Sequence, residues 1–155
     1  MKRSIIYIFI FFLMSVSCTH NDGDIGDWFG HWKLNEIVVD GTVDANYEHN
    51  MFFSFQNSVF AQTIVYPDNS VDRLFANWTD CGNYLIIEYA YAKDEKGNPI
   101  YSENGDLVAL FYPAPITRMS IGENIVNVDY INGNNLQLSM TDSIGQKITY
   151  KLEKW

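Results

Sequence analysis

The chain has 155 residues, with 10 Lys and Arg against 19 Asp and Glu and a formal net charge of −9 at pH 7. Its hydrophobic fraction of 47% can form a buried core, which excludes a disordered chain, and the length leaves room for a single domain. The acidic charge argues against binding to nucleic acid, and the two cysteines cannot form a disulfide framework.

The N-terminal segment is typical of a lipoprotein signal peptide. A basic start precedes an unbroken apolar run over positions 5–14. That run is shorter than the roughly 20 residues that a helix needs to cross a bilayer. It ends at Ser15-Val16-Ser17-Cys18, which resembles the lipobox of bacterial lipoproteins, with Ser15 in the place of the usual Leu. We therefore predict a signal peptide over residues 1–17 and a lipid attached to Cys18.

Two other interpretations of this segment stay open, namely a secretory signal cut near Ser17 and an N-terminal transmembrane anchor. Residues 18–27 are polar, acidic and contain glycine, and we predict that they form a flexible tether. A cysteine that carries two or three acyl chains provides lasting membrane attachment. We expect an outer-membrane lipoprotein in the envelope of a Gram-negative bacterium, and the sequence leaves open whether it faces the periplasm or the outside.

From Trp28 onward, the alternation of apolar and polar residues is the dominant pattern. In the last segment Ile148, Tyr150 and Leu152 share one face of a predicted strand, and polar residues occupy the other face. Turn-forming sequences such as Asp40-Gly41 separate the segments. The predicted strands lie at residues 31–39, 51–56, 59–66, 71–78, 84–91, 126–130, 136–141 and 146–154.

No segment longer than two turns has a helical period, so we predict an all-β domain over residues 28–155. Antiparallel strands with one apolar face leave unpaired edges unless the sheet closes into a barrel or stacks as a sandwich. The short hairpin connections favour an antiparallel up-and-down barrel of eight to nine strands. The two longer connections, residues 41–50 and 93–106, are then loops at its rim. A two-sheet sandwich is the alternative.

The start of the first predicted strand resembles the G-x-W signature of lipocalins, which Gly30 and Trp32 match. In that family a 3₁₀ turn leads into the strand, and the Trp closes one end of the barrel. The resemblance therefore implies a lipocalin-like barrel, and together with the lipobox and the tether it is similar to small lipocalin-like bacterial lipoproteins. Lipocalins usually pack an Arg of the last strand on this Trp. Here that strand offers only lysines, at 147, 151 and 154, which can form a cation–π contact but no flat stack.

The sequence carries no nucleophile elbow, zinc-protease motif, P-loop or dinucleotide fingerprint. His31 is adjacent to Trp32, so its side chain should point away from the interior. Glu36 falls on the inward face by simple alternation, but the apolar residues after it indicate a β-bulge that turns it outward. Glu88 is expected at the surface. We predict no catalytic residue, no metal and no cofactor, and a hydrolase built on Glu36 and Glu88 is the weakest alternative.

We predict no chemical role for Cys81 or for the segment 93–106. Cys81 is the only thiol besides Cys18, and it lies in a turn-forming cluster without a second cysteine for a disulfide or a zinc site. The segment 93–106 is rich in oxygen ligands, but Lys96 interrupts the alternation that an EF-hand requires. We expect two solvated turns of a long hairpin there.

Two functions follow for such a barrel. The first is a membrane-anchored, non-catalytic binding protein, which we expect to be a monomer, and the lipocalin resemblance implies a small apolar ligand inside its barrel. The alternative is a solid barrel whose loops contact a protein or a glycan. A continuous cavity of about 300 Å³ or more would favour the first, and a filled interior the second. The residues predicted to line the lumen, chosen by strand alternation, are Leu34, Phe55, Tyr66, Phe75, Leu85, Tyr89 and Tyr130.

Overall fold

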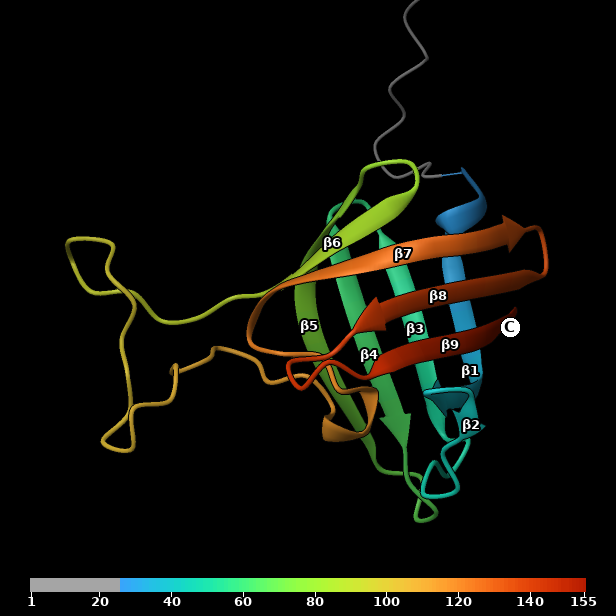
Figure 1. Cartoon of the computed structure of the whole chain (residues 1–155), viewed down its shortest axis with the longest axis horizontal. Coiled ribbons are helices and arrows are strands. Elements are labelled where there is room, and N and C mark those ends of the chain that lie inside the picture. The colour runs from blue at the N-terminus through green and yellow to red at the C-terminus, as the bar shows by residue number, and fades with distance from the viewer. Residues whose placement is uncertain (1–25) are drawn as a thin grey trace, which may run out of the picture.

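The structure, a computed structural model, describes residues 26–155, so the predicted signal peptide, Cys18 and residues 18–25 of the tether lie outside the described residues. The described chain forms nine strands and two 3₁₀ helices, η1 (Gly26–Trp28) and η2 (Pro115–Thr117) (Figure 1). Within it, no helix has the length and apolar character needed to cross a bilayer. The strands are β1 (Gly30–Val39), β2 (Thr42–Val43), β3 (Met51–Gln56), β4 (Val59–Val65), β5 (Val71–Asp80), β6 (Tyr84–Tyr89), β7 (Gly122–Asn132), β8 (Asn135–Thr141) and β9 (Lys147–Lys154).

The strands follow one another around a closed antiparallel barrel. From β3 to β9 each strand pairs with the next one in the chain, β1 pairs with β3, and β9 returns to pair with β1. The short β2 pairs with the end of β1 and is an addition to the eight-stranded barrel. The predicted up-and-down barrel is confirmed. The sandwich alternative is wrong, because one continuous ladder of hydrogen bonds runs around the sheet.

The predicted and observed strands agree closely, and the differences have local causes. The strand β2 was not predicted, because both of its residues are exposed and it has no apolar face to reveal it. A tight turn produces it, since Asp40 and Gly41 both have positive φ angles, 48° and 85°. The strand β7 begins at Gly122, four residues before the predicted start. The helix η1 includes Gly26 and Asp27, which were assigned to the tether.

The first strand contains the β-bulge that was predicted near Glu36. The register between β1 and β9 shifts between Leu34 and Glu36. Because of this shift, the Glu36 carboxylate lies outside the barrel, 2.7 Å from Nζ of Lys151. The shift also returns Ile37 to the interior, where it is fully buried. Glu88 is exposed on β6, as predicted.

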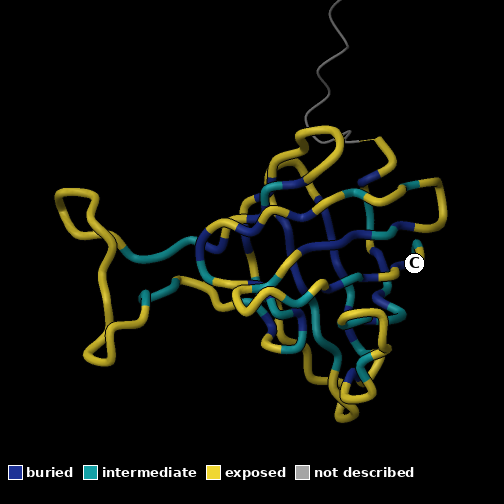
Figure 2. Tube along the Cα trace, viewed as in Figure 1, coloured by how far each residue is buried: buried dark blue, intermediate teal, exposed yellow. Residues whose placement is uncertain are grey.

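Large side chains fill the interior of the barrel. Trp32, Phe53, Phe60 and Tyr150 have no solvent-accessible surface. The ring of Phe53 meets those of Phe60 and Tyr150 edge-on, with centroids 5.1 Å and 5.7 Å away. Side chains without accessible surface border no void that could admit a water molecule. The barrel is therefore solid where these rings meet, and Figure 2 shows its strands largely buried there.

The helix η1 brings two tryptophans together at the start of β1. The Trp32 indole donates a hydrogen bond to the backbone carbonyl of Trp28 at 3.1 Å, and the Trp28 indole donates to the carboxylate of Asp80 at 3.0 Å. Nζ of Lys154 lies 5.1 Å from the centroid of the Trp32 ring, which confirms that a lysine of the last strand can take a cation–π position there. Gly30 has a φ of 121°, which favours glycine.

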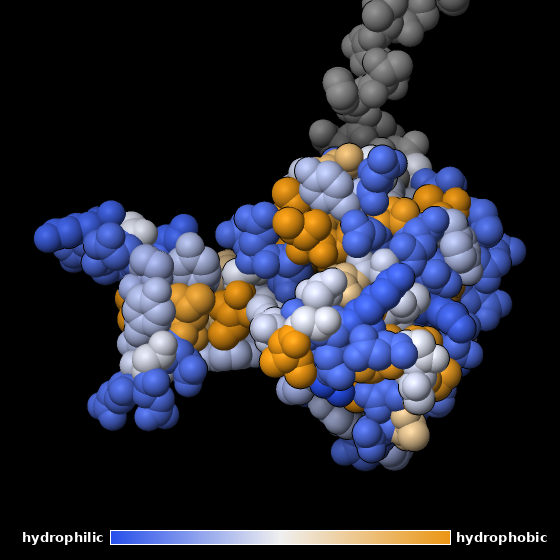
Figure 3. All heavy atoms as spheres, viewed as in Figure 1, coloured by the Kyte–Doolittle hydropathy of each residue, from blue (hydrophilic) through white to orange (hydrophobic). Residues whose placement is uncertain are grey.

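Residues 90–113, called the arm below, project away from the barrel between β6 and η2 (Figure 1). Three backbone hydrogen bonds form a cyclic junction at its centre. The amide of Ala92 donates to the carbonyl of Val108, that of Val108 to Ile100, and that of Ile100 to Ala92, at 2.7, 3.0 and 2.9 Å. Two solvated turns form the tips, as predicted for residues 93–106. Figure 3 shows apolar atoms between these hydrophilic tips.

Replacing Trp32 by Ala should lower the free energy of unfolding by about 3–5 kcal/mol, because it removes a fully buried indole from a packed interior. Trp155 is the matched control, since 77% of its surface is exposed and its loss should change stability by less than about 1 kcal/mol. Urea unfolding followed by circular dichroism measures both. Equal effects of the two substitutions would contradict the role given to Trp32.

Candidate functional site

The structure does not gather the predicted lumen residues around a common cavity. Leu34, Phe55, Leu85 and Tyr89 point into the barrel, but each has 0% accessible surface. They are packing residues of the core and line no space that a ligand could enter. The prediction that they form the wall of a lumen therefore fails in this structure, because neighbouring aromatic rings fill the space that a ligand would need.

The other three predicted wall residues are exposed. Phe75 lies on the outer surface, since β5 turns its even-numbered positions inward. Tyr130 also faces outward, because a second bulge, between Val128 and Tyr130, reverses the alternation of β7. Tyr66 lies beyond the end of β4, where its hydroxyl donates to the carboxylate of Asp72 at 2.9 Å. Alternation fails for Tyr130 at the bulge and for Tyr66 at the strand end. Phe75 lies on a regular part of β5, and its prediction was wrong because the inward face of that strand holds positions 74, 76 and 78.

The segment 114–119, which contains η2, covers the end of the barrel away from η1 (Figure 1). Its residues Ala114, Thr117 and Met119 are buried. Gln62, which is fully buried on β4, holds the segment in place: its side-chain oxygen accepts a hydrogen bond from the amide of Ala114 at 2.8 Å, and its side-chain nitrogen donates to the Thr117 hydroxyl at 3.2 Å. The segment 114–119 therefore closes this end of the barrel, and hydrogen bonds from the buried Gln62 hold it there.

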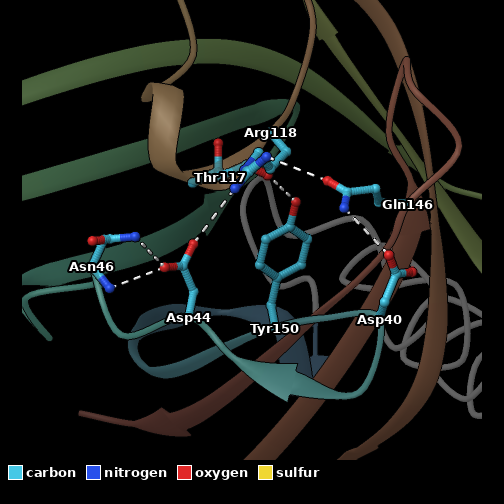
Figure 4. A network of polar contacts seen from close by, with 7 residues as sticks. All are labelled: Asp40, Asp44, Asn46, Thr117, Arg118, Gln146 and Tyr150. Atoms are coloured by element: carbon cyan, nitrogen blue, oxygen red, sulfur yellow. Dashed lines mark hydrogen bonds and ion pairs between the residues drawn. The ribbon is translucent and has the colours of Figure 1, made fainter.

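A polar network fastens the same segment to the barrel (Figure 4). The Arg118 guanidinium lies 3.7 Å from the Asp44 carboxylate and donates to the side chain of Gln146 at 3.5 Å. Gln146 in turn donates to Asp40 at 3.3 Å. The Tyr150 hydroxyl, inside the barrel, donates to the backbone carbonyl of Thr117. The residues on either side of β2 and the hairpin between β8 and β9 therefore hold the covering segment jointly.

Burial controls the ionisation of the interior tyrosines. It raises the pKa of Tyr47 from 10.0 to about 12 and raises the pKa values of Tyr89 and Tyr150 further. Within residues 26–155, the Tyr89 hydroxyl and the Trp78 indole nitrogen have no hydrogen-bond partner. The tyrosines stay protonated at neutral pH and therefore supply no general base.

The residues that we considered for metal binding or thiol chemistry make ordinary structural contacts. In residues 26–155, no group of three or more His, Cys, Asp and Glu side chains could hold a metal ion. On the arm, Asp94 accepts hydrogen bonds from the Asn98 side chain and from backbone amides, which lowers its pKa. Cys81 is exposed, and its hydrogen bond with Tyr84 raises the pKa of that tyrosine.

The outer surface of β1, β3, β4 and β5 carries a groove of about 260 Å³, called the outer groove below. His31 points outward, as predicted, and its Nδ1 forms a 2.7 Å hydrogen bond with Oγ of Ser54. Ser54 and Ala61 form the floor, where they are only 6% and 9% exposed although they face outward. Arg73 and Phe75 rise beside them from β5. The groove forms because the small side chains of Ser54 and Ala61 lie between the larger ones of His31 and Phe75.

Comparison with known proteins assigns the chain to a family. The family model described as a lipocalin-like domain matches residues 12–143. The chain belongs to the lipocalin-like family. No curated protein matches the sequence significantly.

Two solved structures share the lipocalin-like fold. A lipocalin-like protein from Bacteroides uniformis ATCC 8492 is 21% identical, with a TM-score of 0.56, and the match covers 84% of this chain and 100% of that one. An uncharacterised protein from Bacteroides eggerthii DSM 20697 is 18% identical, also with a TM-score of 0.56, covering 83% and 99%. At these identities the similarity shows the fold alone.

Sequence reasoning missed three residues that the structure places at the covering segment and the outer groove of this lipocalin-like domain. Gln62 and Arg118 fasten the covering segment, and Arg73 lines the outer groove. The alternation of β4 does contain a signal, because Gln62 lies between two inward apolar positions and a buried amide requires partners. No comparable signal marks Arg73, which takes an ordinary outward position on a strand.

The stability of the lipocalin-like domain should fall as the pH rises above 10. The unfolded chain loses tyrosine protons near pH 10, whereas folded Tyr47 retains its proton up to about pH 12, so the free energy of unfolding decreases over this window. Tyr89 and Tyr150 add to this decrease, because burial also raises their pKa values. Urea unfolding at pH 8, 10 and 11 measures the change. Constant stability from pH 8 to pH 11 would contradict the burial of these hydroxyls.

Tyr89→Phe and Tyr150→Phe form a matched pair at pH 8. The first removes a buried hydroxyl that has no partner, so stability should stay equal or rise by about 1 kcal/mol. The second leaves the Thr117 carbonyl without its donor and should lower stability by about 1–3 kcal/mol. The same urea titrations compare the two variants. A larger loss for Tyr89→Phe than for Tyr150→Phe would disprove the assigned hydrogen bonding.

Proposed function

We propose that this protein is a monomeric, non-catalytic binding lipoprotein, tethered to the outer membrane through Cys18, that recognises its ligand on the outside of a solid barrel. Membership in the lipocalin-like family supports a binding function. The filled interior is the observation that favours binding on the outside of the barrel over binding inside it. Four side chains that were expected around a lumen have no accessible surface. Buried hydrogen bonds from Gln62 also close the mouth of the barrel.

Exposed features of the barrel support binding on the outside. The outer groove combines polar side chains with the ring of Phe75. At the base of the arm, Leu110, Phe111 and Tyr112 are 64%, 44% and 56% exposed. Exposed apolar side chains that gather in one region of a folded domain are typical of binding surfaces. A small apolar ligand inside the barrel, the alternative, would require the packed rings to separate.

Native mass spectrometry of the whole chain, released from detergent micelles after incubation with palmitate, tests the choice of surface. We expect no one-to-one palmitate complex inside the barrel, because the interior has no space for an acyl chain. Any complex should therefore disappear in a double variant with Phe75→Ser and Phe111→Ser, which alters only exposed rings. A complex that persists in that variant would place the lipid inside and overturn the proposal.

The proposed anchor makes a separate prediction about the two cysteines. Cells fed an alkyne-labelled fatty acid should label the wild-type chain and a Cys81→Ala variant, because Cys81 is an exposed turn residue outside the lipobox. A Cys18→Ala variant should show no label, since the thiol that would be acylated is gone. Gel fluorescence of the purified chains measures the incorporation. Equal labelling of the Cys18→Ala variant, or none in the wild-type chain, would refute the anchor.

A further inference from the structure

The outer groove lies on a face whose charge differs from that of the chain as a whole. The chain has 19 Asp and Glu. Residues paired across antiparallel strands share a face, so the ladders of β3, β4 and β5 identify the outward positions. At these positions, Arg73 is the one charged side chain that the structure describes. On the flanking strands, Lys33 of β1 pairs with Phe52 and Glu88 of β6 pairs with Asn77. Between them, the outward positions of β3, β4 and β5 hold a cation and no carboxylate, which favours an anionic ligand.

Arg73 has no partner within the described chain. None of its guanidinium nitrogens forms an ion pair or a hydrogen bond with residues 26–155, whereas Arg118 pairs with Asp44. A guanidinium presents a planar fork of donors that matches the two oxygens of a carboxylate. Because one arginine lines the groove without a second Lys or Arg, the charge complement is a single carboxylate rather than a doubly charged phosphate.

The wall of the outer groove that holds Arg73 is also aromatic, because Phe75 lies two residues further along β5 on the same face. Phe75 is 38% exposed, and the arm residue Phe111 holds its ring edge-on, with 5.6 Å between the centroids. Beyond it, a second hollow of about 140 Å³ lies between Val59, Phe75, Leu110 and Phe111. Val59 and Phe75 line both hollows, so the polar and apolar parts are continuous. A ligand lying along β5 would meet Arg73 and, beside it, an aromatic surface that continues to Phe111.

The floor of the groove and the side that faces β5 add hydrogen-bonding capacity. The Ser54 hydroxyl fixes the orientation of the His31 ring, and Gln56 and Thr63 also line the groove. These side chains suit a ligand with hydroxyl or carbonyl groups next to its carboxylate. The volume of about 260 Å³ has room for roughly one ring with its substituents and is too small for a long acyl chain or a folded peptide.

We propose that the outer groove binds the carboxylate of a ring-bearing organic acid on Arg73, with the ring packed against Phe75. This inference rests on the proposed function, because it names the ligand class for recognition on the outside of the barrel. Two sources share the chemistry: the uronic acid unit of an acidic glycan, and a free aromatic acid. The first presents a sugar face and hydroxyls to the groove, and the second presents an aromatic face.

Isothermal titration calorimetry of the whole chain in detergent micelles tests the inference with two pairs of probes. Trigalacturonate is compared with its methyl ester, and phenylacetate with phenylacetamide, so that each pair differs in the charge of the carboxyl group. We expect at least one acid to bind with a dissociation constant below about 1 mM, and its neutral analogue to bind at least about tenfold more weakly, because the contact with Arg73 is charge-assisted.

Three variants locate the site. Arg73→Gln should weaken binding at least about tenfold, and Arg73→Lys should restore part of the affinity because it keeps the charge without the fork. Lys96→Gln is the matched control, because it removes the same charge from an exposed tip of the arm and should change affinity less than about twofold. Thermal unfolding by circular dichroism checks that all three variants are folded.

Each outcome of the titrations is decisive. Binding of trigalacturonate alone supports an acidic glycan, and binding of phenylacetate alone supports an aromatic acid. Loss of binding in Arg73→Gln but not in Lys96→Gln supports the groove. If neither acid binds the wild-type chain, the inference is overturned. It is also overturned if Arg73→Gln binds as tightly as Lys96→Gln. The palmitate experiment then still decides the proposed function, because it reports on the interior and not on Arg73.

Discussion

Closure of the sheet between β1 and β9 is the constraint on which the other features depend. The two strands can pair along their whole length only because the bulge after Leu34 absorbs one residue. With that shift, Ile37 returns to the interior and Glu36 meets Lys151 in solvent. The same register brings Lys154 over the ring of Trp32. A barrel without open sheet edges results, and its interior is shaped by the side chains of all eight strands.

A closed eight-stranded barrel has an interior that side chains can fill, and here large rings do so. Phe53, Phe60 and Tyr150 meet at the centre, and the segment with η2 covers the mouth. Eight-stranded barrels can also hold one small ligand, but the interior of this lipocalin-like barrel is filled by its own side chains. Tight packing makes the interior a source of stability, and a binding function then needs features on the outside.

The outside of the barrel carries such features because side-chain size varies along it. Small residues at Ser54 and Ala61 leave space between the larger His31 and Phe75. The base of the arm extends this surface, since Phe111 packs against Phe75. The arm is itself ordered by a cyclic set of backbone hydrogen bonds, so its base has a defined position next to β5. Residues distant in sequence thereby contribute to a single surface.

The sequence by itself determined the eight strands of the barrel, their up-and-down order, the bulge at Glu36 and the need for a lysine rather than an arginine beside Trp32. Each of these follows from alternation, turn residues or the limited choice of side chains on one strand. Only the tertiary structure decided that the interior is solid, that residues 114–119 close the mouth, and that Phe75 and Tyr130 face outward. These features depend on the fit between side chains of distant strands and on a second bulge in β7. The local sequence pattern does not show how the volumes of side chains from opposite strands add up, nor how a strand is aligned with its neighbour.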